Sequence, residues 1–207
     1  MNEPGDIAAG AGAPGVKSGA MAGAERLAAL AARWSARLGG AVILFAAILV
    51  TAEVANRNLE PWLGLGIKLH AFELTNYAFA SAVAFGFAYA LTERSHIRID
   101  LLYARLPVGL RAGLDAAALL ALAVLGTGMA WQGWRVVLRS AELGARPNAT
   151  LDLPLAIPQA LWAVGLSWFA AVALLLAVLA LVDLVTGQVN RLNTRAGIPS
   201  VAEEAKS

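Results

Sequence analysis

The stretch that decides the fold is residues 153–182, LPLAIPQALWAVGLSWFAAVALLLAVLALV, in which no residue is charged. A helix over these residues is about 45 Å long at ~1.5 Å per residue, and the hydrocarbon core of a bilayer is about 30 Å thick. The stretch is therefore long enough to cross a membrane. Its excess length indicates a helix that is tilted or that extends beyond the lipid.

Three more apolar stretches precede it, so the four predicted spans lie at about residues 34–54, 72–92, 110–137 and 156–184. Hydrophobic residues make up 59% of the 207 residues and charged residues only 14%, whereas about a quarter of a soluble domain is charged. The charges gather between the apolar stretches, which indicates separate membrane spans and not one large soluble core. The sequence predicts an all-α membrane protein with four transmembrane helices.

The segments outside the spans differ in composition. Residues 1–19 are mostly Gly, Ala and Pro, which bury too little to offset the entropy of ordering, so a disordered tail is expected. They contain no apolar signal-peptide core, so the first span should be retained as an anchor. Residues 20–38 favour a short amphipathic interfacial helix, and are equally consistent with the solvated start of the first span. The apolar face of this segment consists of Leu27, Leu30, Trp34 and Leu38.

The basic residues predict the orientation, because positively charged loops resist translocation. Eleven of the 16 Lys and Arg lie before the first span, between the second and third spans, or after the fourth. These are Lys17, Arg26, Arg33, Arg37, Arg94, Arg98, Arg105, Arg111, Arg191, Arg195 and Lys206. Both termini and the middle loop are therefore expected in the cytoplasm (N-in/C-in). The membrane domain is expected to cover residues 20–190, followed by a cytoplasmic tail over residues 191–207.

Four carboxylates lie near the predicted span ends, namely Glu53, Glu73, Asp115 and Asp183. Water and headgroups reach charged groups at such positions, so interfacial anchors or partner contacts are expected. Glu53 with Arg57, and Arg111 with Asp115, also have the i,i+4 spacing of helical ion pairs.

The sequence offers no catalytic, metal or cofactor site. It contains no cysteine, which excludes disulfides and thiolate chemistry. His96 and Asp100 are four residues apart, but His70 is predicted on the other side of the membrane, and zinc normally takes about three or four protein ligands. The net charge of +2 does not indicate nucleic-acid binding. The charge-free span interiors lack the groups with which transporters bind solutes, so a self-sufficient small transporter is disfavoured.

The most distinctive segment is residues 93–102, ERSHIRIDLL, followed by Leu106-Pro107 and then Arg111. It resembles a loop of the small membrane subunit of tripartite ATP-independent periplasmic (TRAP) transporters, the DctQ-like family. That loop reads approximately Arg-x-x-His-Ile-x-Val-Asp-Leu-Leu before a Leu-Pro. The matching residues here are Arg94, His96, Ile97, Asp100, Leu101, Leu102 and Pro107. Ile99 stands where valine is common, and one residue fewer separates the arginine from the histidine.

Two further stretches are similar to that family, and together the resemblance covers about residues 34–185. Glu73 matches an acidic residue at the start of the second span, with Phe72 in place of a frequent tryptophan. Residues 150–154, TLDLP, with Pro158, resemble the Thr-x-x-Leu-Pro segment before the fourth span, although leucine and alanine replace the usual aromatic pair. Without the family, the middle loop is a generic positive-inside connection whose arginines bind lipid phosphates.

The resemblance implies the small permease subunit of a secondary transporter in the bacterial inner membrane. This chain would be a fixed scaffold beside the large elevator-type membrane subunit, which holds substrate and sodium. The transporter would import organic anions, such as carboxylates or sugar acids, by sodium symport after delivery by a periplasmic binding protein. A non-transport membrane adaptor or assembly factor is the alternative, since four helices and a basic loop serve either role.

Three groups of candidate site residues follow. The cytoplasmic-loop motif consists of Arg94, His96, Arg98 and Asp100. Candidate contacts with the binding protein are Arg57, Glu60, Lys68, Arg139, Glu142 and Arg146. Candidate interfacial or subunit-packing residues are Glu53, Glu73, Arg111, Asp115 and Pro154. Membrane lipid is expected as a further partner, whereas a catalytic residue, a metal, a cofactor and nucleic acid are not expected.

Overall fold

The computed structural model describes residues 15–63, 70–93, 106–147 and 152–187. These ranges contain no strand, and four helices in them are long and apolar enough to cross a membrane. The helices are α1 (Gly15–Leu63), α2 (Ala71–Thr92), α4 (Val108–Glu142) and α5 (Ala156–Val185). The predicted all-α class with four apolar helices is confirmed.

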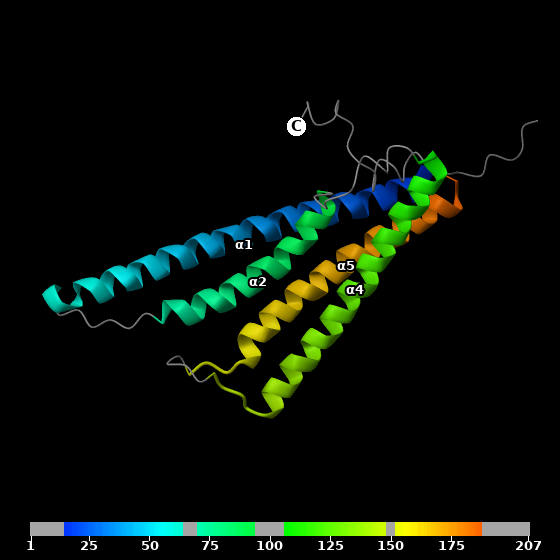
Figure 1. Ribbon diagram of the computed structural model, residues 1–207. Helices are drawn as coiled ribbons and strands as arrows, with labels where there is room; N and C mark the ends of the chain where they lie inside the picture. The colour runs from blue at the N-terminus through cyan, green and yellow to red at the C-terminus, as the bar shows by residue number, and fades with distance from the viewer. Residues whose placement is uncertain (1–14, 64–69, 94–105, 148–151, 188–207) are drawn as a thin grey trace, which may run out of the picture.

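The helices form a row in the order α1, α2, α5, α4, because the main contacts join α1 to α2, α2 to α5 and α5 to α4. Figure 1 shows the α1–α2 pair and the α4–α5 pair spreading apart toward the end at which α1 ends and α2 begins. Among the described residues, the edge helices α1 and α4 therefore leave one side each without a neighbouring helix. The apolar side chains on those sides need lipid or another protein to cover them.

Small residues line the contacts between helices. Most of the buried residues are alanines, and the largest fully buried side chains are Leu166 and Val172. A Cβ added at Gly165 on α5 would lie only 2.8 Å from the Cβ of Ala84 on α2. Small contact residues let helix backbones approach closely where lipid supplies no hydrophobic driving force. Large apolar side chains point outward instead, which is the pattern of a protein whose solvent is lipid.

The helix ends follow local sequence signals. Pro107 precedes the first residue of α4, and its carbonyl oxygen accepts hydrogen bonds from the N–H groups of Leu110 and Arg111. Proline suits such a position because its φ is fixed near the helical value. Gly144, just after α4, has φ +57°, a left-handed conformation that glycine adopts without strain and that commonly ends a helix.

The first helix is longer than expected, since α1 has 49 residues and is therefore about 73 Å long at ~1.5 Å per residue. It begins at Gly15, within the segment expected to be a tail, and residues 20–38 continue into the first span without a break. The predicted apolar face of this segment is exposed, with Leu27 at 68% and Leu38 at 64%. Its placement at the membrane surface stays a prediction, as do the orientation and the domain boundaries.

Candidate functional site

Glu53 joins the first two spans at the end where they diverge from the other pair. Its Oε2 accepts a hydrogen bond from the backbone N–H of Ala71, the first residue of α2, at 2.5 Å. The preceding His70 adopts a left-handed conformation with φ 50° and forms no side-chain cap. A carboxylate from α1 thus satisfies an N–H at the α2 N-terminus, where negative charge is favoured. Glu73 lies in the first turn of the same helix.

Two of the carboxylates near span ends are buried inside this chain. Asp115 on α4 is 2% exposed and Asp183 on α5 is 4% exposed. The expectation that water and headgroups reach these two groups is wrong, because α4 and α5 pack closely through alanines such as Ala112 and Ala180. Both carboxylates interact with other groups, as a buried charge requires. Sequence reasoning located them at helix ends but could not tell which face of each helix is covered.

The other two predicted packing residues have local roles. Arg111 is half-buried, and its Nε donates a hydrogen bond to the carbonyl oxygen of Leu106 at 2.8 Å, which fixes the chain just before α4. The carbonyl oxygen of Pro154 accepts a hydrogen bond from the N–H of Ile157 at 3.1 Å, at the start of α5. Both contacts set where a helix begins. Contact of either residue with another subunit stays a prediction.

Arg139 and Glu142 line an open hollow near the end of α4, together with Gln132, Arg135, Val136 and Leu138. Arg146, in the following loop, forms an ion pair with Asp152. The side-chain hydrogen bond and then the Coulombic attraction to Asp152 raise the pKa of Arg146 above its usual value. Arg146 therefore has a partner within its own loop, whereas Arg139 is exposed on α4.

The remaining predicted site residues are not described in full. Arg57 is exposed near the end of α1, and Glu60 lies in the last turn of that helix, but its side chain lies outside the described residues. Lys68 and the cytoplasmic-loop motif, Arg94, His96, Arg98 and Asp100, also lie outside the described residues. The proposed roles of these residues stay predictions.

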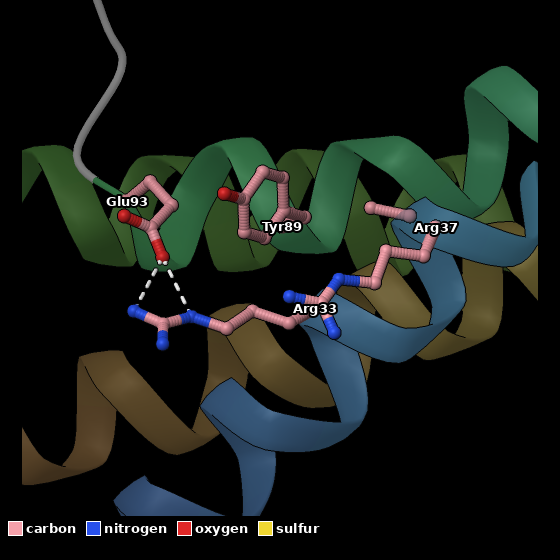
Figure 2. Close-up of a pocket in the computed structure, with 5 residues that line it drawn as sticks. Arg33, Arg37, Tyr89 and Glu93 are labelled. Atoms are coloured by element: carbon pink, nitrogen blue, oxygen red, sulfur yellow. Dashed lines mark hydrogen bonds and ion pairs between the residues drawn. The ribbon is translucent and has the colours of Figure 1, made fainter. Parts of the chain in front are cut away.

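A second hollow, of about 370 Å³, lies between α1 and α2 and was missed by sequence reasoning. It is lined by Arg33, Ala36, Arg37, Tyr89 and Glu93. Figure 2 shows Arg33 and Arg37 reaching from α1 toward Tyr89 and Glu93 of α2. Arg33 pairs with Glu93, with 3.0 Å between Nη2 and Oε1. The pair joins residues 60 positions apart, so no local spacing rule could have found it.

The chemistry of the described side chains is that of anchoring and packing. Within the described ranges, no group of three or more His, Cys, Asp or Glu side chains is placed to hold a metal ion. Four long apolar helices with small-residue contacts and outward-facing large side chains define a multi-pass helical membrane protein.

Comparison with known families identifies which kind of membrane protein this is. The family model described as "Tripartite ATP-independent periplasmic transporters, DctQ component" matches residues 46–187, well over half of the chain. The chain belongs to this family, the small membrane subunit of TRAP transporters, and the predicted resemblance is confirmed. The family is a transporter component and not an enzyme family. No curated protein and no solved structure matches the chain.

Proposed function

We propose that this chain is the fixed scaffold subunit of a TRAP transporter in the bacterial inner membrane, packed against the large membrane subunit. In the complex, the large subunit binds and moves an organic anion, such as a carboxylate or a sugar acid, with sodium. A periplasmic binding protein delivers the anion. The observation that carries the proposal is the family match over residues 46–187, which includes all of α2, α4 and α5 and part of α1.

The surface of α1 supports a partner in the membrane. In the most apolar 18-residue stretch of α1 only 11% of the residues are buried, against 44% in the corresponding stretch of α5. Leu44, Phe45 and Ile48, near its middle, are 68%, 65% and 67% exposed. This surface suits a large apolar partner as well as lipid, and it belongs to an edge helix of the row.

The distribution of charge supports a scaffold role. From Leu38 to Ala52 on α1 and from Leu74 to Thr92 on α2 there is no charged residue. A subunit that binds ions or solutes within the membrane needs ionisable or unwound elements there. On these two helices the charged groups lie at or beyond the ends of the charge-free stretches, where they suit anchoring, whereas Asp115 on α4 and Asp183 on α5 are buried inside this chain.

Purification from the native membrane tests the assignment. A tagged full-length chain, extracted in mild detergent, should co-purify with a large TRAP membrane subunit identified by mass spectrometry. Deletion of the gene should abolish binding-protein-dependent, sodium-dependent uptake of a radiolabelled organic acid, and reintroduction should restore it. Robust uptake without this chain, or by this chain reconstituted alone, would show that the proposed division of labour is wrong.

The contact with the binding protein has its own test at Arg139. Arg139 is exposed on α4, whereas Arg146 already pairs with Asp152, so substitution of Arg146 would also disturb the α4–α5 loop. Arg139→Glu should reduce the apparent affinity of the transporter for its loaded binding protein. Arg26→Glu, an exposed arginine near the opposite end of the molecule, is the matched control and should leave it unchanged. Unchanged transport in the Arg139 variant would count against this contact.

A further inference from the structure

The hollow between α1 and α2 lies at a membrane boundary on both helices. On α1 the charge-free stretch begins directly after Arg37, and on α2 it ends directly before Glu93. Trp34 and Tyr89 lie within one turn of these charged residues, and such aromatic side chains favour the headgroup level. Both helices that line the hollow therefore pass from an apolar span to a charged segment at the same depth, the expected boundary between hydrocarbon and headgroups.

The charges in the hollow do not balance. The charge of Arg33 is neutralised by Glu93. The Nε and the Nη2 of Arg33 each lie 3.0 Å from the same carboxylate oxygen, Oε1 of Glu93. Arg37 lies one turn further along α1, with its Cζ 5.4 Å from the ring centroid of Trp34. Among the described residues, no carboxylate pairs with Arg37. Two guanidinium groups against one carboxylate leave the hollow with one surplus positive charge.

The ligand that fits these walls is an anion with an apolar part. A guanidinium fork matches the oxygens of a phosphate, and the hydroxyl of Tyr89, which also lines the hollow, can donate to the same group. Beside the hollow, Leu38 is 64% exposed at the start of the charge-free stretch and presents an apolar surface toward the hydrocarbon region, whereas Trp34, 60% exposed, lies on the headgroup side of Arg37. A free phosphate would use the charges but leave this apolar surface uncovered.

We propose that the hollow binds the phosphate of an anionic phospholipid, with Arg37 as the principal contact, Trp34 beside the headgroup and the acyl chains lying along Leu38. The Arg33–Glu93 pair forms one wall and holds α1 to α2 at this level. Glu93 also limits affinity, because it neutralises the second guanidinium. The proposal rests on the geometry of α1 and α2 and does not depend on the transport function.

Lipid binding to the purified full-length chain tests the site. The chain is delipidated in detergent and titrated with short-chain phosphatidylglycerol, and bound lipid is counted by native mass spectrometry. Arg37→Gln should weaken the tightest binding event by about tenfold, the loss of one charge-assisted contact. Arg26→Gln, an exposed arginine on α1 about two turns before Arg33, is the matched control and should leave that event unchanged.

Glu93→Gln distinguishes a binding site from a merely structural role. Release of Arg33 from its carboxylate should strengthen phosphatidylglycerol binding several-fold, whereas general damage to the fold would weaken it in both variants. Phosphatidylcholine and inorganic phosphate at millimolar concentration are the two competitors. Equal binding of phosphatidylcholine, or displacement of the lipid by inorganic phosphate, would overturn the assignment to an anionic lipid. So would an Arg37→Gln variant that binds phosphatidylglycerol like the wild type.

Discussion

At the scale of single residues, Glu53 makes the most informative contact, because the sequence and the structure give it different partners. Its spacing predicts an ion pair with Arg57 on α1, whereas its carboxylate accepts the N–H of Ala71 at the start of α2. Glu53→Ala should lower the free energy of unfolding by about 0.5–2 kcal/mol, as expected for loss of an N-terminal cap. Arg57→Ala, one turn away and exposed, should stay within about 0.5 kcal/mol. Equal losses in denaturant titrations in micelles would favour the ion pair.

The buried carboxylates show what residue spacing leaves undetermined. Asp115 and Asp183 lie near helix ends, as the positions of charged residues in the sequence indicate. Their exposed fractions of 2% and 4% depend on which faces of α4 and α5 meet, and that is a tertiary property. Arg33 and Glu93 make the same point, since their pairing requires α1 and α2 to lie side by side.

At the scale of elements, Gly165 controls how closely α2 and α5 approach. A methyl group there would lie 2.8 Å from the Cβ of Ala84, so the helices would have to separate. Gly165→Ala should therefore destabilise the protein by about 1–3 kcal/mol, a cost of overpacking that exceeds the helical gain of about 0.5–1 kcal/mol. Gly128→Ala on α4 is the control, because its Cβ would meet nothing within 4 Å and only the helical gain remains. Thermal unfolding in detergent should move in opposite directions in the two variants, and an increase in both would contradict the close contact.

Element types were predictable because the membrane imposes a minimum length on an apolar helix. The predicted span 156–184 and the helix α5, Ala156–Val185, differ by one residue at one end, since Pro154 and Pro158 confine its start. The N-terminal end of α1 was harder to predict, because residues 1–19 contain few large apolar side chains to mark a helix. The order α1, α2, α5, α4 could not be read from the sequence, because alanines occur on several faces of each span and do not identify the neighbour.

At the scale of the whole molecule, the open row of helices explains why the chain suits a complex. In a closed bundle each helix would have neighbours on two sides. Here the two edge helices have one main neighbour each and retain exposed large apolar side chains, such as Phe45 on α1 and Trp131 on α4. In a bilayer these faces contact lipid or a second protein, and the family assigns the chain to a transporter of several components. The charges at the helix ends then determine how the row is oriented across the membrane.

The orientation is testable because the chain contains no cysteine, so single-cysteine variants start from an unreactive background. Leu143, just after α4, is 70% exposed, and the excess of basic residues in the segments on the other side predicts that this end of α4 lies outside the cytoplasm. Ser200 belongs to the predicted cytoplasmic tail. In cells with a permeabilised outer membrane, a membrane-impermeant maleimide should label Leu143→Cys but not Ser200→Cys, and disruption of the inner membrane should allow both to react. The reverse pattern would invert the orientation, and labelling of both from outside would mean that α5 does not cross the membrane.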